Sequence, residues 1–127
     1  MDGFFSNSRY VKLLSPGDFD PVATWKLKTK EPSMVLFFVN WCGYCKAVKD
    51  EWEKLGKQTG YCNVYAFDCD KHKGHTDKIK TDRPGLIQGY PTIVMYCNGE
   101  PKETHSGERT VASFTQTCMR CSSGKKV

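Results

Sequence analysis

The chain has 127 residues, with 19 basic and 14 acidic side chains and a formal net charge of +5. This length predicts one domain, residues 1–127, whose core needs no disulfide staples. The basic segments lack an aromatic-rich pattern and the apolar runs are too short to span a bilayer, so we expect neither nucleic acid nor a membrane as partner. We expect the positive charge to form a solvated basic face, which could also attract acidic protein partners through electrostatic steering.

The first third of the chain predicts a strand, a helix and a second strand. Residues 10–14 suit a short strand, and residues 15–17, Ser-Pro-Gly, have turn chemistry. Asp20 can cap a helix and Pro21 can occupy its first position, so we expect a helix from Asp20 through residue 30. Residues 34–39 are continuously apolar, which predicts a strand buried on both faces at the centre of a sheet.

A second helix is expected to begin at Cys42. Its apolar residues recur at helical spacing as Cys45, Val48, Trp52 and Leu55. Because Cys45 belongs to this stripe, we expect Cys45 to point inward and Cys42 to face solvent.

The rest of the chain predicts a mixture of strands and helices. Asn98-Gly99 is a typical two-residue hairpin turn. This alternation predicts an α/β fold in which a mixed sheet is covered by helices on both faces. The expected elements are strands over 63–69, 92–97 and 102–106, a short helix over 76–80, and a last helix from about Thr110.

The segment Trp41-Cys42-Gly43-Tyr44-Cys45-Lys46 carries the most specific chemical pattern. A thiol attacks a disulfide as the thiolate, which is favoured at a helix N-terminus by the unpaired N–H groups and the helix dipole. Cys45 lies one turn further on, so an internal disulfide can form and release a substrate held as a mixed disulfide. The alternative is half of a zinc site, but the strand-then-helix placement favours redox chemistry.

The five other cysteines and the histidines admit more ordinary interpretations. Because seven cysteines cannot all pair within one chain, at least one is free, modified or intermolecular. Cys62, Cys69 and Cys97 are expected to be buried as packing residues. Cys118 and Cys121 are expected either as unpaired thiols in a flexible tail over about 118–127 or as a second redox centre. We expect no metal site at His72, His75 or His105, because a third nearby ligand is missing.

Three motifs give the chain a family resemblance. They are Trp41 to Lys46, then Gly89-Tyr90-Pro91-Thr92, then Gly107-Glu108-Arg109-Thr110. With these motifs the chain resembles the thioredoxin superfamily, and most closely the catalytic, a-type domains of protein disulfide isomerases. The resemblance covers nearly everything from Tyr10 to about Thr117 and implies the thioredoxin fold, a central mixed sheet with helices on both faces.

The resemblance also implies roles for individual residues. Cys42 would be the nucleophile and Cys45 the resolving thiol, with their disulfide as the redox centre and no added cofactor. Pro91 would be cis and would present the Tyr90 backbone as an edge to which a substrate strand can add. Arg109 would approach Cys45 and favour its thiolate, and Lys46 could act similarly. The apolar contact surface around the exposed sulfur would include Trp41, Gly43 and Tyr44.

Four positions depart from the family pattern. Leu36 stands where these families commonly bury a proton-relay acid, six residues before Cys42, and Ala66 replaces the lysine that often partners it. Asp50 occupies the usual kink-proline position. Tyr44 replaces the proline of reducing thioredoxins and the histidine of isomerases, which predicts an intermediate reduction potential. We therefore expect slower resolution by Cys45 than in typical relatives.

These patterns predict a thiol–disulfide oxidoreductase that acts on protein disulfides, of the isomerase or the thioredoxin type. Its electron partner would be glutathione or a separate reductase, and the protein would be a monomer or a weak dimer. The alternative is a redox-regulated binding module with little turnover. No signal peptide is visible and residues 122–127 lack a retention signal, so we expect a soluble protein, cytosolic or virion-associated rather than lumenal.

Overall fold

A computed structural model describes residues 4–58 and 60–124 of the chain and shows one mixed five-stranded sheet. Its strands lie in the order β1-β5-β4-β6-β7, with β1 and β4 parallel to β5, and β6 antiparallel to both β4 and β7. The continuously apolar segment forms β4, which lies at the centre as predicted. The strand bounds are Lys12–Leu13 for β1, Ser33–Phe38 for β4, Asn63–Asp68 for β5, Thr92–Cys97 for β6 and Glu100–Thr104 for β7.

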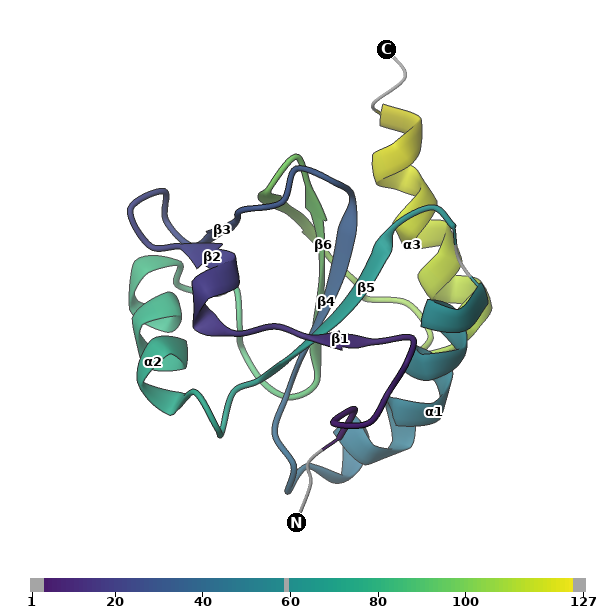
Figure 1. Cartoon of the computed structure of the whole chain (residues 1–127), viewed down its shortest axis with the longest axis horizontal. Helices are drawn as coiled ribbons and strands as arrows, with labels where there is room; N and C mark the ends of the chain where they lie inside the picture. The colour runs from purple at the N-terminus through teal and green to yellow at the C-terminus, as the bar shows by residue number, and fades with distance from the viewer. Residues whose placement is uncertain (1–3, 59, 125–127) are drawn as a thin grey trace.

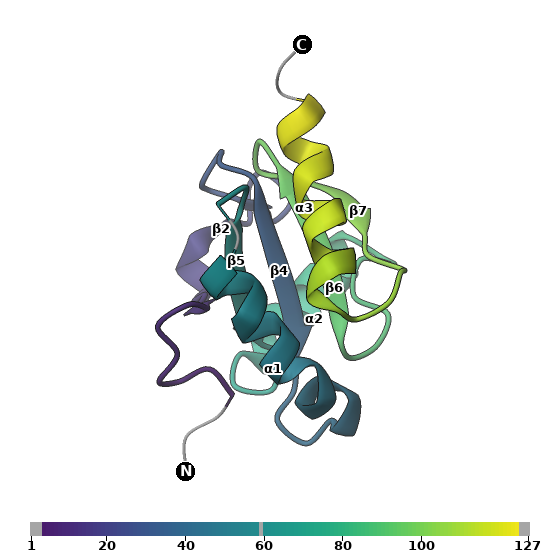
Figure 2. The ribbon, with the colours of Figure 1, turned by 90° about the vertical axis from the view of Figure 1, so that its right-hand side faces the viewer.

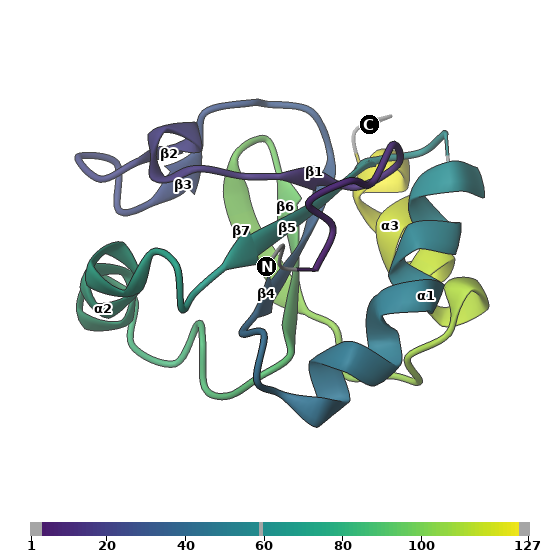
Figure 3. The same ribbon diagram turned by 60° about the horizontal axis from the view of Figure 1, so that its bottom comes forward.

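Helices cover both faces of this sheet, as the sequence predicted. Helices α1 (Gly43–Gln58) and α3 (Val111–Gly124) pack on one face, and α2 (Lys73–Asp82) lies on the other (Figure 1). A view turned by 90° shows α1 and α3 side by side in front of β4 (Figure 2), and a third view shows α2 beyond the opposite face (Figure 3). Among the described residues, no helix is long and apolar enough to cross a membrane.

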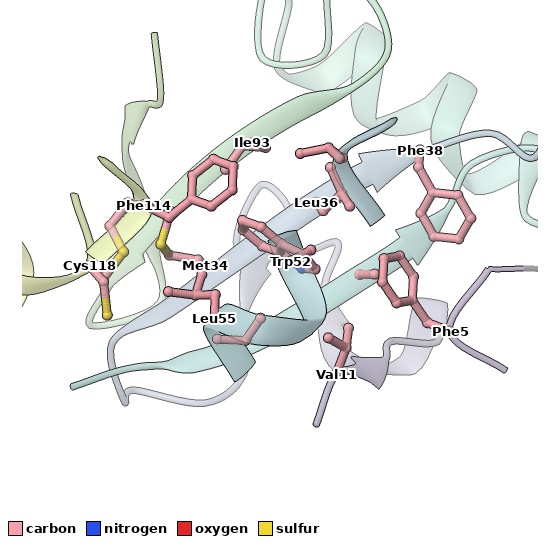
Figure 4. Close-up of a cluster of buried hydrophobic side chains, with 14 of the residues drawn as sticks. Phe5, Val11, Met34, Leu36, Phe38, Trp52, Leu55, Ile93, Phe114 and Cys118 are labelled. Atoms are coloured by element: carbon pink, nitrogen blue, oxygen red, sulfur yellow. The ribbon is translucent and has the colours of Figure 1, made fainter. Parts of the chain in front are cut away.

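The core consists of two apolar layers that meet at β4. Side chains alternate across a strand, so Met34, Leu36 and Phe38 pack toward α1 and α3, while Val35 and Phe37 pack on the opposite face. All five are fully buried. Figure 4 shows the first layer, in which Leu36 and Met34 lie beside side chains from α1 and α3. This burial on both faces fixes where β4 ends and therefore where the segment after it emerges.

The helix expected from Asp20 through residue 30 is wrong. Here the chain forms a hairpin of β2 (Phe19–Asp20) and β3 (Lys26–Leu27), preceded by a short 3-10 turn at Pro16–Asp18. The Asp20 carboxylate accepts hydrogen bonds from the N–H groups of Val22 and Ala23, at 3.1 and 3.4 Å. Such side-chain-to-backbone bonds compete with helix formation, and contacts with α2 then hold the turn.

These contacts come from two side chains at the end of α2. The Trp25 indole N–H donates to Asp82 at 2.7 Å, and Arg83 Nε donates to the Thr24 carbonyl at 2.8 Å. Thr24 and Trp25 both have positive φ, 54° and 63°, which reverses the chain direction. Local sequence signals cannot report this tertiary anchoring, because the partners lie more than fifty residues away.

The other elements match the sequence with small shifts of boundary. Strand β6 has the predicted bounds, and Asn98 and Gly99 both have positive φ, 56° and 87°, as a tight hairpin turn requires. Because this turn uses only two residues, β7 begins at Glu100 and not at residue 102. Strand β1 is shorter than predicted, and α2 is longer than the expected 76–80.

Two disulfides correct the expectations for four cysteines. Cys62 pairs with Cys118, and Cys97 pairs with Cys121, with Cα–Cα distances of 5.9 and 5.7 Å. Instead of a flexible tail, residues up to Gly124 continue α3, in which Cys118 and Cys121 are buried; residues 125–127 lie outside the described part. A pairing of Cys118 with Cys121, the geometry of a second redox centre, is therefore absent among the described residues.

Both disulfides lie at the end of the sheet opposite to Cys42. The start of β4, Ser33, is in register with Asn63 on one side and with Tyr96 on the other, next to Cys62 and Cys97. Cys118 and Cys121 are three residues apart in α3 and can therefore reach both strand ends from one helix face. The bonds fasten α3 to the sheet without touching the segment that follows β4.

Removing the Cys62–Cys118 disulfide should lower the free energy of unfolding by about 4 kcal/mol, because the bond closes a loop of 56 residues in the unfolded chain. The measurement is urea unfolding of Cys62→Ser/Cys118→Ser, with mass analysis to confirm that Cys97–Cys121 is intact. The matched pair Cys97→Ser/Cys121→Ser closes a shorter loop of 24 residues and should lose about 3 kcal/mol. A loss below about 1 kcal/mol in both would show that neither bond is structural.

Candidate active site

Cys42 caps the N-terminus of α1, four residues after β4 ends at Phe38. The Cys45 N–H donates to Cys42 Sγ at 3.2 Å, and the Lys46 N–H donates to the Cys42 carbonyl at 3.1 Å. This is the geometry of an N-cap side chain, with sulfur in the position usually taken by oxygen. An N–H donor aimed at the sulfur, together with the positive end of the helix dipole, suits a sulfur that must carry negative charge.

The segment before β6 brings a backbone carbonyl to the same sulfur. Cys42 Sγ donates to the Tyr90 carbonyl at 3.4 Å. The Tyr90–Pro91 peptide bond is cis, which confirms what the family resemblance implied for Pro91. Residues 48 positions apart thus meet at one atom, as the family resemblance implied.

The two cysteines of the motif differ sharply in exposure. Cys45 is fully buried and Cys42 is partly exposed, as the apolar stripe of α1 predicted, and both are free thiols. Trp41 and Tyr44, which flank Cys42, are 72% and 71% exposed. Gly43 also faces solvent, and no heavy atom lies within 4 Å of the position that a Cβ would take there. The attacking sulfur is therefore accessible, with two large aromatic side chains beside it.

Burial dominates the acid–base behaviour of Cys45. Burial, and next the hydrogen bond with the Cys42 side chain, raise the pKa of the Cys45 thiol to about 12. Leu36 and Ala66, at the positions of the missing acid and lysine, are register partners on β4 and β5 and are both fully buried. Leu36 and Cys45 belong to the same apolar cluster. The surroundings thus favour the neutral form of Cys45, and among the described residues no carboxylate is one of the groups that shift its pKa.

Cys69 and Lys80 lie near the site, and the sequence analysis did not identify either as a functional candidate. Cys69, treated there as a packing residue, is buried and free, and burial raises the pKa of its thiol to about 11. Burial, and then Cys69, raise the pKa of the Tyr90 hydroxyl. The Lys80 ammonium lies 5.3 Å from the centre of the Tyr90 ring. Neither contact has a local sequence signal, because each joins Tyr90 to a different part of the chain.

Arg109 and Lys46 are both exposed, and Arg109 contacts the motif through Tyr44. Its guanidinium carbon lies 5.9 Å from the centre of the Tyr44 ring, a cation–π arrangement. The influence of Arg109 on Cys45 stays a prediction, since the groups that shift the pKa of Cys45 here are Val39 and the other two free cysteines.

The histidines take ordinary structural positions. His105 interacts through its ring nitrogens with the Thr117 hydroxyl and the Glu108 carbonyl, both at 2.8 Å, and His72 immediately precedes α2. Within residues 4–58 and 60–124, no group of three or more His, Cys, Asp or Glu side chains could hold a metal ion.

The fold thus brings together a cysteine at a helix cap, a buried second thiol and the loop that carries Tyr90 and Pro91. The thioredoxin family matches residues 13–120, so the chain belongs to the thioredoxin family. Members of this family use their own redox-active cysteines and need no further cofactor.

The most informative relatives are proteins named as disulfide isomerases. The chain is 28% identical over 120 residues to protein disulfide-isomerase like 2-2 of Arabidopsis thaliana, covering 94% of this chain and 25% of that protein. It is 35% identical over 105 residues to protein disulfide isomerase-like 2-3 of Oryza sativa subsp. japonica, covering 80% and 21%. The chain thus spans about a quarter of the length of these curated relatives.

Solved structures agree on the fold. The J-Trx1 fragment of ERdj5 has a TM-score of 0.72 at 17% identity, covering 91% of this chain and 51% of that one. Thioredoxin f from spinach chloroplast has a TM-score of 0.65 at 18% identity, covering 95% and 98%.

Introducing an acid at position 36 should speed the attack of Cys45 on a mixed disulfide at Cys42. A carboxylate there can accept the Cys45 proton, so Leu36→Glu should resolve about tenfold faster than Leu36→Gln, the matched variant without an ionisable group. Rapid mixing of each preformed mixed disulfide measures the rate, and thermal unfolding checks that both variants are equally folded. Equal rates in the two variants would remove the idea that the missing acid limits resolution.

The resolving step of the unmodified protein should accelerate steadily with pH. Below its pKa a thiol gains about tenfold in thiolate fraction per pH unit, and burial raises the pKa of Cys45 to about 12. The rate at which Cys45 releases a small thiol from Cys42 should therefore rise without a plateau from about pH 7 to 10. A plateau below about pH 8 would show that Cys45 ionises more easily than its burial implies.

Proposed function

We propose that the protein exchanges disulfide bonds with client proteins, in the manner of a disulfide isomerase or a thioredoxin. The observation that carries this proposal is the environment of one atom. Cys42 Sγ lies 3.2 Å from the Cys45 N–H and 3.4 Å from the Tyr90 carbonyl, partly exposed above a buried second thiol. An accessible nucleophile with a protected resolving thiol is the arrangement that disulfide exchange needs.

The reaction transfers two electrons from the protein's dithiol to the client. The Cys42 thiolate attacks one client sulfur, the client's S–S bond breaks, and the other client sulfur leaves as a thiolate that takes up a proton. Cys45 then loses its proton and attacks Cys42 Sγ. A Cys42–Cys45 disulfide forms and the second client sulfur leaves as a thiol. The reverse sequence introduces a disulfide into a reduced client.

The exposed surroundings of Cys42 would bind the client. The side chains of Trp41 and Tyr44 are mostly exposed, so their apolar surface is available to a client. Gly43 leaves open space between Cys42 and Tyr44. Tyr90 and Pro91 are both partly exposed, and a client strand could add along their backbone.

The direction of exchange depends on the reduction potential and on the electron partner. A reducing thioredoxin has a potential near about −270 mV, and disulfide isomerase lies near about −180 mV. Tyr44 provides neither proline's rigidity nor histidine's charge, so we place the protein between these values. Glutathione or a separate reductase would exchange electrons with it.

A redox-regulated binding module is the second candidate, and one observation favours it. Because burial raises the pKa of Cys45 to about 12, a client bound to Cys42 would be released slowly. Such a protein would retain clients at Trp41 and Tyr44 and would turn over little.

The compartment stays a prediction, for which the sequence favoured a cytosolic or virion-associated protein. The two disulfides bear on it because such bonds persist in oxidising environments, virion surfaces included, and are rare in the cytosol. Alkylation of cell extracts followed by mass analysis would show whether Cys62–Cys118 and Cys97–Cys121 form where the protein is made.

Equilibration with defined glutathione mixtures, read by mass, should yield a Cys42–Cys45 disulfide with a potential between about −270 and −180 mV. Cys42→Ser should abolish turnover of a disulfide client, whereas Cys45→Ser should accumulate the mixed disulfide. Client binding that survives Cys42→Ser unchanged, together with negligible turnover by the unmodified protein, would favour the binding module. Failure to form the Cys42–Cys45 disulfide at any mixture would contradict the oxidoreductase.

A further inference from the structure

Four exposed cations surround the site without acidic partners. They come from four different segments and are Lys46 in α1, Lys71 before α2, Lys80 in α2 and Arg109 before α3. Within the described part of the chain, the side chains of these four form no salt bridge within 4 Å. Unpaired charges of one sign around a surface create a potential that attracts an oppositely charged ligand.

Two of these cations are positioned by the tyrosines of the site. Lys80 lies 5.3 Å from the Tyr90 ring, and the Tyr90 carbonyl accepts from Cys42 Sγ. Arg109 lies 5.9 Å from the ring of Tyr44, which belongs to the first turn of α1. Arg109 thus contacts a tyrosine of the cysteine motif, and Lys80 contacts the tyrosine whose carbonyl meets Cys42 Sγ.

The other two cations line a groove next to the motif. The groove has a volume of about 860 Å³ and combines apolar side chains from the first strand region with polar ones from the ends of β4 and β5. It lies at the carboxyl ends of the parallel strands, where open α/β sheets commonly bind ligands. The lining residues that matter here are Phe4, Leu13, Leu14, Asn40, Lys46 and Lys71.

Nearby acids offset these charges only in part. The Asp68 carboxylate accepts from the Asn40 amide at 2.9 Å and from two backbone N–H groups, at 3.1 and 3.0 Å. Asp77 pairs with Lys73 at 3.3 Å. Asp70 and Glu108 are exposed. With Asp68, which keeps its charge and also lines the groove, three acids stand against the four cations, so the balance around the site stays positive.

We propose that the preferred clients carry acidic residues next to the cysteine that Cys42 attacks, held by Lys80 and Arg109 over the tyrosines and by Lys46 and Lys71 along the groove. This inference rests on the proposed exchange function and names its client class. The apolar lining beside Lys46 and Lys71 gives a polypeptide segment area to bury, which a simple anion would not use.

The test uses two peptides that each contain one internal disulfide. One has Glu at the two positions on each side of a cysteine, and the other has Gln there, which preserves shape and removes charge. The fully reduced protein reacts with each in a single turnover, followed by acid quenching and mass analysis. Because flanking acids also change the intrinsic reactivity of a disulfide, each rate is divided by the rate of dithiothreitol with the same peptide.

The normalised rate for the Glu peptide should exceed that for the Gln peptide by about three- to tenfold at low salt, since each exposed charge pair contributes up to about a factor of five. The preference should fall toward one at about 1 M salt, where the screening length is about 3 Å. Lys71→Glu/Lys80→Glu should abolish or invert it. The control is Lys102→Glu, one charge reversal on exposed β7 at the far edge of the sheet, which should retain the preference.

Each contrary result has its own meaning. Equal normalised rates for the two peptides would overturn the client preference and leave the exchange function standing, whereas no reaction with either peptide would overturn both. An equal loss in Lys102→Glu and in the double variant would assign the effect to net charge and refute the four-cation site.

Discussion

The burial of β4 on both faces is the constraint on which the site depends. Two apolar layers hold this strand, so the chain must leave the sheet where the layers end, and α1 begins three residues after Asn40. That short connection places Cys42 at the helix cap, where the Cys45 N–H reaches its sulfur. The same central strand pairs with β6, which brings the Tyr90 carbonyl to the other side of Cys42. The position of the reactive atom is therefore a consequence of core packing.

The core also determines the chemistry available to the second thiol. Cys45 lies in the apolar layer that includes Leu36, and burial there raises the pKa of its thiol, with no carboxylate among the described groups that shift it. The two cysteines therefore favour different steps. The accessible Cys42 sulfur captures a client readily, whereas the buried, neutral Cys45 thiol releases it slowly. An isomerase benefits from a mixed disulfide that lasts long enough to rearrange, whereas a reductase benefits from fast release.

The two structural disulfides and the free thiols lie at opposite ends of the sheet. The four cysteines that staple α3 lie at the end where β4 begins, and the three free thiols are Cys42 and Cys45, just beyond its other end, and Cys69, just beyond the end of β5. A disulfide exchanger must keep its own structural bonds away from its nucleophile, since any thiolate within reach would attack them. The cations occupy the reactive end, so the charge that could select clients is concentrated there.

The sequence by itself determined the fold class, the central strand and the orientation of Cys42 and Cys45, because the apolar periodicity that sets them is local. The cis form of Pro91 was predicted from the family resemblance, which the three motifs carry together. Only the tertiary structure decided the partners of Cys62 and Cys97, the hairpin after Asp20, and the place of Lys80 and Arg109 over tyrosine rings. Each of these depends on residues that are distant in the chain and become neighbours only after the sheet and helices pack. The residues that neighbour a cysteine or a lysine in the sequence do not indicate which distant residue it will contact in the folded protein.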